Sequence, residues 1–243
     1  VRRWGAGVTV PASLVGVRDR GRTVLRGPLL DLETRLDARF VAWAHALGAT
    51  EERHPPTMDA ATLDRLGWFG NFPHLATFPV SLDDAALDAF AAAPRDADGA
   101  LRLDGLAPAA HVMTPAACYP VYADLEGARL DGPRVVTVRA TCFRRETTYT
   151  PLERQWAFGM REIVVIGTKD EVAARLDALV PRVTALQDAL GFGATWEDAT
   201  DPFFRPARNA AYLVQKLEPV KRELVFDGRL AIASVNLHHD HFG

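Results

Sequence analysis

Apolar residues recur at the spacing of an α-helix in two long stretches of this chain. Over Leu29–Leu47 most third or fourth positions are apolar, and Gly48 follows as a stop signal. Over Lys169–Leu190 the same spacing returns and ends at Gly191. These patterns predict two long amphipathic helices, each with one wide apolar face to bury against the rest of the protein.

Two shorter helices are predicted between the long ones. Met58–Leu66 is expected to be helical, with Asp59 as its N-cap. Ser81–Ala92 is expected to be a second short helix, capped by Ser81 with Asp84 three residues later.

Strand patterns occupy other parts of the chain. Val8–Val17 predicts a short strand or hairpin, and Val135–Thr141 and Ile163–Ile166 predict two strands joined by a polar loop. Within Tyr212–Asn236, two more strands are expected around Asp227–Gly228, a dipeptide typical of hairpin turns. Because the strands come in pairs with helices between the groups, the pattern favours an α+β fold with an antiparallel sheet over a βαβ series.

Composition narrows the class of protein. The 243 residues are 48% hydrophobic, so one sizeable core is expected, and the net charge of −3 offers no basic surplus for nucleic acid. The apolar runs are far too short to span a membrane, and the first residues lack the long apolar segment of a signal peptide. We therefore expect a cytoplasmic protein with no membrane partner, in which Cys118 and Cys142 are free thiols.

Most of the residues that could take part in binding or catalysis lie between Cys118 and Thr168. The segment FRRE closes the first strand there, and alternation places Arg144 and Glu146 on one face and Arg145 on the other. A guanidinium is a rigid fork that suits a phosphate or a carboxylate. Taken alone, the alternative of an Arg–Glu pair on a solvated strand is preferred. Neither a GxGxxG nor a GxxxxGK[ST] motif is present, which argues against a Rossmann or P-loop site.

Several segments that follow one another along the chain favour the anion-binding interpretation of Arg144 over a solvated ion pair. They read FPHLATF, ACYPVY, ATCFRRE and FGMREIVVIGT, then FFRPARNAAYLVQKLEPVKRELVF and LAIASVNLHHDHFG. Together they resemble class II aminoacyl-tRNA synthetases, whose motif 2 is a strand–loop–strand unit that opens with F-R-x-E. The resemblance is greatest to amino acid–[carrier protein] ligases, which are small homologues of the atypical, zinc-dependent seryl-tRNA synthetases. It covers roughly residues 28–243 and implies one catalytic core over residues 1–243, with residues 1–27 as an N-terminal extension.

The resemblance implies an ATP site. Arg144 would hold the α-phosphate and Glu146 would approach the adenine amino group, while Arg154 in the loop would assist the γ-phosphate. Glu223 would anchor Mg²⁺, which prefers hard oxygen ligands, although a surface carboxylate is an equally good interpretation. A preplaced arginine fits this chemistry because attack on ATP builds negative charge on the α-phosphate.

The resemblance also implies a zinc site that binds and recognises the substrate's amino group. Cys118 and Glu162 match two ligands of the family, and the open position would take the amine. From the residues alone, a small buried hydrophobe and a surface carboxylate are the better interpretations. Ser234 and Asn236 fall where the seryl-type enzymes have their aminoacyl pocket. Cys142 is expected in the core, on the face opposite Arg144.

Two other features carry weaker signals. His238, His239, Asp240 and His241 form a dense cluster, for which a variable polar loop is preferred over a metal site. Leu29–Leu47 and the strand that follows it, which ends at Pro55–Pro56, resemble motif 1, the dimer element of the family. The resemblance therefore implies a homodimer, and a helix that covers its own sheet is the alternative.

The chain departs from the family at its end. No G-x-E-R segment of motif 3 and no third cysteine appear before Gly243. Three explanations stay open: a fragment, a partner that supplies the missing residues, or a protein that does not activate amino acids. The long helical arm that holds tRNA in seryl-tRNA synthetases is also missing, so tRNA is not expected as a partner.

The expected function is ATP-dependent activation of glycine or alanine as an aminoacyl-adenylate, followed by transfer to the phosphopantetheine thiol of a carrier protein. The alternatives are a catalytically impaired, synthetase-like binding module and a fragment of a seryl-type tRNA ligase.

Overall fold

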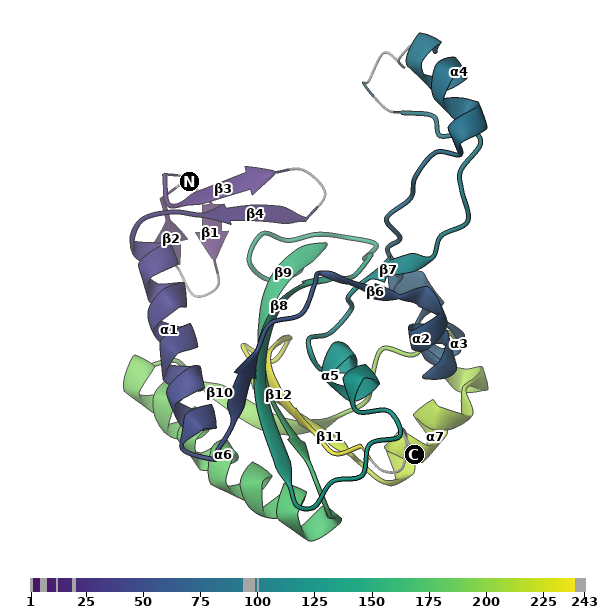
Figure 1. The fold of residues 1–243 in the computed structure, drawn as a ribbon. Helices are drawn as coiled ribbons and strands as arrows, with labels where there is room; N and C mark the ends of the chain where they lie inside the picture. Colours follow the sequence, from purple (N-terminus) through teal and green to yellow (C-terminus); the bar gives the residue numbers. More distant parts are fainter. Residues whose placement is uncertain are drawn as a thin grey trace.

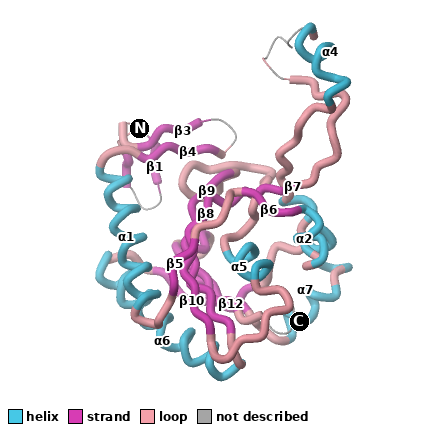
Figure 2. Tube along the Cα trace, viewed as in Figure 1, coloured by secondary structure: helices cyan, strands magenta, loops and turns pink. Residues whose placement is uncertain are grey.

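The computed structural model describes residues 2–4, 8–11, 13–18, 21–93, 99 and 101–238. Figures 1 and 2 show strands running through the middle of the body, with α1 and α6 along one side and α5 and α7 on the other. A thin arm carrying α4 projects from this body (Figure 1). Within the described residues, no helix combines the length and the apolar character needed to cross a membrane.

The sheet that carries the predicted chemistry has three strands in the order β5–β8–β9. β8 (Arg134–Phe143) and β9 (Ala157–Ile166) pair antiparallel over ten residues each. β5 (Thr50–Glu52) lies parallel to β8, which the expectation of an antiparallel sheet did not include. The two predicted strands are confirmed, and both are longer than their apolar runs because polar residues on the outer face continue the alternation.

One core packs between this hairpin and α5 (Cys118–Asp124). Side chains at alternate positions of β8 and β9 point to one face of the sheet, and on this face they meet the helix. The buried members are Ala117, Val121, Val136, Val138, Ala140, Cys142 and Val164. This packing fixes α5 above the inner face of the hairpin, which we define as the face toward α5.

The second sheet is antiparallel, with the order β10–β11–β12. Its strands are β10 (Ala194–Ala199), β11 (Lys221–Phe226) and β12 (Leu230–Asn236). Asp227 and Gly228 both take positive φ angles, 54° and 63°, in the turn between β11 and β12, so the predicted hairpin is confirmed.

The predicted long helices are also confirmed. They are α1 (Pro28–His45) and α6 (Lys169–Leu190). α6 begins with a capping box, in which Thr168 and Glu171 satisfy each other's backbone N–H groups. A further helix, α7 (Ala210–Leu217), occupies residues of which the last were expected to be strand. Asn209 caps α7 by accepting a hydrogen bond from the N–H of Tyr212, and this local cap favours the helix.

The remaining elements are short. The strands are β1 (Arg2–Trp4), β2 (Val8–Val10), β3 (Val15–Arg18), β4 (Arg22–Leu25), β6 (Thr57–Asp59) and β7 (His111–Met113). The helices are α2 (Ala60–Arg65) and α3 (Trp68–Asn71), with 3₁₀ turns η1 (Pro73–Leu75) and η3 (Pro206–Arg208). A second core forms around α2, α3 and β7 from Met58, Leu63, Trp68, Leu75 and Val112. Asp59 stands at the N-cap of α2 as predicted, but its side chain makes no capping hydrogen bond.

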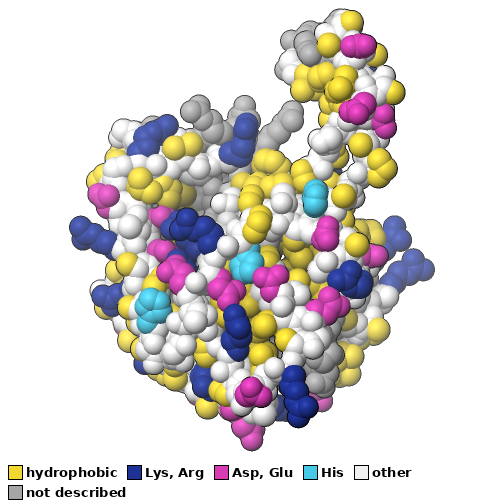
Figure 3. Space-filling model, in the orientation of Figure 1, with side chains coloured by type: hydrophobic (Ala, Val, Ile, Leu, Met, Phe, Trp, Pro, Cys, Tyr) yellow, Lys and Arg dark blue, Asp and Glu magenta, His cyan; other side chains and the backbone are white. Residues whose placement is uncertain are grey.

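The arm differs from its prediction. Instead of one helix over Ser81–Ala92, it contains η2 (Asp84–Ala86) followed by α4 (Leu87–Ala92). The side chain of Asp83, rather than Ser81, accepts the capping hydrogen bond, from the N–H of Ala85 at 3.1 Å. Figure 3 shows hydrophobic side chains gathered on this arm. The large exposed ones are Phe78, Val80, Leu87, Leu101, Leu103 and Leu106.

Candidate active site on the inner face of the β8–β9 hairpin

The structure brings Cys118 and Glu162 together. Glu162 lies on β9 and points to the inner face, where Cys118 opens α5. The Glu162 carboxylate accepts a hydrogen bond from the N–H of Ala117 at 3.0 Å and a side-chain hydrogen bond from Cys118. The fold therefore brings a thiol and a carboxylate from distant parts of the sequence into direct contact.

Burial dominates the protonation of this pair. It raises the pKa of the Cys118 thiol well above its usual range, and the charge of Glu162 raises that pKa further. Burial also raises the pKa of Glu162, against the opposing effect of its hydrogen bonds with Cys118 and Ala117. With its pKa raised in this way, the Cys118 thiol favours its protonated form and donates its hydrogen to Glu162.

Arg144 lies beside this pair, just past the end of β8. Its Nε donates to the carbonyl oxygen of Pro115 at 2.9 Å, and its guanidinium lies over the ring of Phe158, 5.4 Å from the centroid. Neither Nη atom makes a hydrogen bond or an ion pair with the residues that the structure describes. The guanidinium is thus held in place with its terminal nitrogens available to an anionic ligand.

Cys142 lies on the same face as Arg144, so the expectation that it would lie opposite is wrong. Residues two apart in a strand point the same way. Burial raises the pKa of Cys142 to about 12, with the charge of Glu162 adding to this rise and that of Arg144 opposing it. Its place in the core is confirmed, and so is the prediction that Cys118 and Cys142 are free thiols.

Glu146 and Arg154 lie in the loop between β8 and β9 and bind each other. The Arg154 Nη1 donates to Glu146 Oε1 at 3.0 Å, and a bridge between Thr150 and Arg154 closes the turn between them. The Arg154 side chain is 54% exposed. Two of the side chains predicted to contact ATP are thus paired with each other.

The β3–β4 hairpin supports this loop at Gly21, where the sequence predicted no contact. The carbonyl oxygen of Gly21 accepts a hydrogen bond from the N–H of Trp156 at 2.9 Å. A Cβ at this position would lie 2.4 Å from the ring of Tyr149 and 2.5 Å from the nitrogen of Trp156, and the φ angle is +74°. Only glycine fits so close an approach.

The other predicted residues share one face of the β11–β12 pair. Glu223 stands directly opposite Ser234, and Lys221 stands opposite Asn236. Asn236 Nδ2 donates to Ser234 Oγ at 3.3 Å. The Lys221 Nζ lies 2.9 Å from the Glu223 carboxylate. Glu223, Ser234 and Asn236 therefore form one polar patch, and Lys221 already occupies one carboxylate oxygen of Glu223.

Sequence reasoning missed Asp201, which anchors Lys221 from the other side. Asp201 accepts from Lys221 Nζ at 2.9 Å and from Gln215 Nε2 at 2.9 Å. Burial alone would raise the pKa of Asp201, but the charge of Lys221 and these hydrogen bonds bring it below its usual value. The alternation of side chains along the strand segment KRE predicts that Lys221 and Glu223 lie on the same face. The loop that holds Asp201 gives no comparable signal in the sequence.

Tyr119 of α5 interacts electrostatically with both the Cys118–Glu162 pair and Asp201. Burial raises its pKa, and the charges of Cys118, Asp201 and Glu162 raise it further while that of Arg144 lowers it. Tyr119 is therefore within electrostatic range of both the thiol–carboxylate pair and Asp201. His238 stands near Tyr122, with ring centroids 6.4 Å apart. His239, Asp240 and His241 lie outside the described residues.

The fit to zinc is partial. A thiolate and a carboxylate are suitable zinc donors, and Cys118 and Glu162 are placed to act together. Among the described residues, however, no group of three or more His, Cys, Asp or Glu side chains comes together. The described part of the chain supplies two donors at one point, whereas a structural or catalytic zinc ordinarily has at least three protein ligands.

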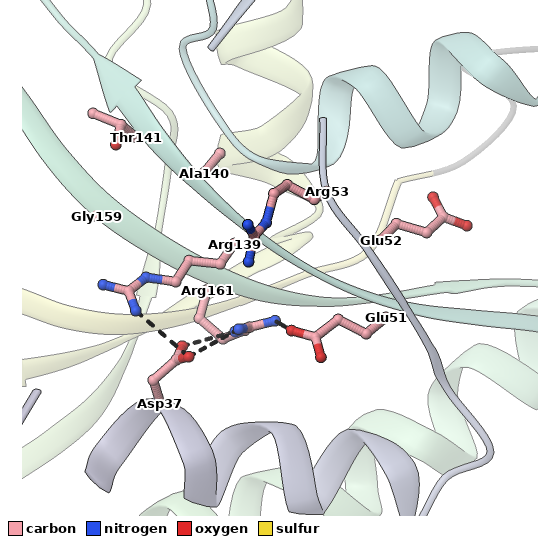
Figure 4. Close-up of a pocket in the computed structure, with 9 residues that line it drawn as sticks. All are labelled: Asp37, Glu51, Glu52, Arg53, Arg139, Ala140, Thr141, Gly159 and Arg161. Carbon is pink, nitrogen blue, oxygen red and sulfur yellow. Dashed lines mark hydrogen bonds and ion pairs between the residues drawn. The ribbon is translucent and has the colours of Figure 1, made fainter. Parts of the chain in front are cut away.

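A cavity of about 670 Å³ lies away from this chemistry. It opens among α1, β5 and the outer face of the hairpin, and its lining is charged (Figure 4). The lining residues are Asp37, Glu51, Glu52, Arg53, Arg139, Ala140, Thr141, Gly159 and Arg161. None of the residues predicted to contact ATP, zinc or the amino acid lines this cavity, so the cavity is separate from the candidate site on the inner face of the hairpin.

Comparison with solved structures identifies the fold. The structure matches M. kandleri SerRS, solved in complex with A. aeolicus tRNASec, with a TM-score of 0.74 and 18% sequence identity, over 95% of this chain and 49% of that one. It also matches Giardia lamblia prolyl-tRNA synthetase in complex with prolyl-adenylate, with a TM-score of 0.59 and 15% identity, over 76% and 35% of the two chains. The protein has the class II aminoacyl-tRNA synthetase fold.

Sequence comparison places it more narrowly. No family model matches the sequence. Amino acid–[acyl-carrier-protein] ligase 1 of Bradyrhizobium diazoefficiens is 36% identical over 208 residues, and ligase 2 of the same organism is 35% identical over 199. These alignments cover 82% and 79% of this chain but 64% and 59% of the relatives, so the chain spans somewhat under two thirds of their length. The chain is therefore similar in sequence to amino acid–[acyl-carrier-protein] ligases over about four fifths of its own length.

Proposed function

We propose that this chain carries residues of an ATP-dependent site that activates a small amino acid, glycine or alanine, and passes it to the phosphopantetheine thiol of a carrier protein. The observation that supports this most is the meeting of Arg144 with Cys118 and Glu162 on one face of the hairpin. One group suits a phosphate and the other two suit an amine or the metal that binds it. The names of the two curated relatives give the same reaction class.

The first step is proposed as attack of the amino acid carboxylate on the α-phosphorus of ATP. A new P–O bond forms, the bond to the β-phosphate breaks, and pyrophosphate leaves. Arg144 stabilises the negative charge that builds on the α-phosphate, because its guanidinium is already oriented. Glu146 and Arg154 would separate to meet the adenine and the γ-phosphate, and Glu223 would hold Mg²⁺ through the carboxylate oxygen that Lys221 leaves open.

The amino group of the substrate is proposed to bind at Cys118 and Glu162. A zinc ion held there would act as a Lewis acid that binds a free amine, and it would select amino acids over hydroxy acids. Ser234 and Asn236 line the aminoacyl side of the pocket. In the second step the carrier thiol attacks the aminoacyl carbonyl carbon, its proton leaves, and AMP departs as the thioester forms.

ATP–pyrophosphate exchange tests the first step. We expect exchange that depends on glycine or alanine in the wild-type chain and is abolished in Arg144→Ala. Wild-type exchange in the Arg144→Ala protein would overturn the assignment. Transfer is then measured as formation of a hydroxylamine-sensitive thioester on a phosphopantetheinylated carrier protein.

A binding module that lacks catalysis is the second candidate. It is favoured by the count of two zinc donors among the described residues. Absence of both zinc and ATP binding, measured by metal analysis and calorimetry, would support this role. A fragment of a seryl-type tRNA ligase is the third, and it predicts aminoacylation of tRNA in place of a carrier.

A homodimer is proposed through α1 and β5, the elements that resemble motif 1. Sedimentation equilibrium tests this directly.

A further inference from the structure

Two arginines stand directly opposite each other on the outer face of the hairpin, behind the candidate site. Arg139 of β8 pairs in register with Arg161 of β9, and the next pair along the ladder is Val138 with Glu162. Like charges at facing positions of neighbouring strands destabilise the pairing. Without neutralisation, the hairpin would be weakest at the point where Glu162 leaves it on the inner face.

Three carboxylates neutralise these arginines. Asp37 of α1 accepts from Arg161 Nε at 2.8 Å and from Arg161 Nη2 at 2.9 Å, and Glu51 of β5 accepts from Arg161 Nη1 at 3.0 Å (Figure 4). Arg139 pairs with Glu33, one helical turn before Asp37. The Arg161 side chain is 9% exposed. A bidentate, nearly buried guanidinium of this kind has a single fixed orientation.

A hydroxyl links this guanidinium to the backbone of Glu162. Arg161 Nη1 donates to Thr137 Oγ1 at 3.4 Å, and Thr137 Oγ1 donates its own hydrogen to the carbonyl oxygen of Glu162 at 3.0 Å. Thr137 is fully buried. Because a hydroxyl has one hydrogen, the donor on one side fixes which way it points on the other.

Glu162 is therefore held from both faces of the sheet. On the outer face its carbonyl oxygen is bound by Thr137, and on the inner face its carboxylate is bound by the N–H of Ala117. The outer contact sets the position of the backbone from which the carboxylate projects. A small displacement there moves the carboxylate relative to Cys118, and a site of this kind is sensitive to displacements well below 1 Å.

We infer that Asp37, Arg161 and Thr137 form a positioning relay that holds Glu162 in register with Cys118. The relay ties α1 to the candidate site through the sheet, so the placement of α1 bears on the binding of the substrate's amino group. The inference rests on the proposed role of Glu162. None of the three residues touches the substrate.

The cleanest test replaces Thr137 by valine and by serine. Valine keeps the shape and strand propensity of threonine and removes the hydroxyl, whereas serine keeps the hydroxyl. In ATP–pyrophosphate exchange we expect Thr137→Val to raise KM for the amino acid by about fivefold, the effect of one lost hydrogen bond, with KM for ATP little changed. Thr137→Ser is expected to restore most of the loss, and Arg161→Lys to behave like Thr137→Val because lysine has no bidentate fork.

A second measurement does not depend on activity. Hydrogen exchange of the Ala117 amide, followed by NMR, reports whether Glu162 still accepts its hydrogen bond. Protection of this amide is expected to fall in Thr137→Val and Arg161→Lys, while the amides of Val136 and Val138 in the same core keep theirs.

Arg134→Met is the matched control. It removes an ion pair with Glu52 at 2.7 Å, which joins β8 to β5. No hydrogen bond between described residues connects this pair to Glu162. The relay is overturned if Thr137→Val and Arg161→Lys leave both the amino acid KM and the Ala117 protection at wild-type values, or if Arg134→Met changes them equally. If the wild type shows no exchange with any amino acid, the proposed function fails, and the Ala117 measurement alone decides on the relay.

Discussion

Replacement of Arg144 by alanine is the sharpest perturbation of the proposed chemistry. The guanidinium is fixed before any ligand binds, by the carbonyl oxygen of Pro115 and the ring of Phe158. Loss of one preorganised donor to developing charge lowers kcat by roughly 10²- to 10³-fold in comparable sites. We expect a loss of at least this size in Arg144→Ala, because the whole cation is removed.

The same substitution carries a cost in stability. Pro115 is fully buried, and its carbonyl oxygen loses the Arg144 hydrogen bond. A buried acceptor left without a partner costs about 1–3 kcal/mol in the free energy of unfolding. Arg144→Lys separates charge from geometry, because lysine keeps the positive charge but lacks the Nε donor and the planar fork. Arg144→Lys is expected to be at most about tenfold faster than Arg144→Ala, which corresponds to about 1.4 kcal/mol in the activation free energy.

The assay is initial-rate ATP–pyrophosphate exchange at saturating amino acid, with urea unfolding of each variant to confirm that it is folded at the assay temperature. A folded Arg144→Ala protein whose exchange rate stays within a few-fold of wild type would refute the role in phosphate binding. Equal rates for Arg144→Lys and wild type would show that charge alone suffices and that the orientation by Pro115 is irrelevant.

Three further outcomes are expected. Asp37→Asn should lower stability at neutral pH by roughly 1–3 kcal/mol; because the hydrogen bonds from Arg161 lower the pKa of Asp37, this cost should disappear as the pH falls below about 4. Purified protein should contain zinc by mass spectrometry, and Cys118→Ser should lose it while Cys142→Ala keeps it. Leu63→Ala should lower the free energy of unfolding by about 2–5 kcal/mol in urea titration, because the leucine is fully buried in the second core.

The sign of the pH prediction follows from linkage. A carboxyl whose pKa is depressed on folding adds stability above its unfolded pKa and loses it as the pH falls through the folded value. A difference between Asp37→Asn and wild type that grows toward acid would contradict the reasoning. For zinc, equal content in Cys118→Ser and wild type would remove Cys118 from the site. For Leu63, a change below about 1 kcal/mol would show that the second core relaxes around the loss.

The elements that were predicted correctly depend on local patterns. The helices over Pro28–His45 and Lys169–Leu190, and the hairpin at Asp227–Gly228, each express a periodicity or turn preference contained within a few residues. The errors lie where local signals compete. Ser81 and Asp83 are both plausible caps, and the expected strand KLEPVKRELVF overlaps the last two residues of α7, Lys216 and Leu217, which the structure places in the helix.

The sequence by itself determined the strand–loop–strand unit, the residues able to carry phosphate and metal chemistry, and the family that the order of motifs resembles. Only the tertiary structure decided that Glu162 meets Cys118, that Cys142 shares the face of Arg144, and that Asp201 and Lys221 support Glu223. It also decided that Arg161 is tied to Asp37 on α1. The physical reason is range: helix and strand periodicity act between residues a few positions apart, whereas these contacts join residues that only the packing of α1, α5 and two sheets brings together.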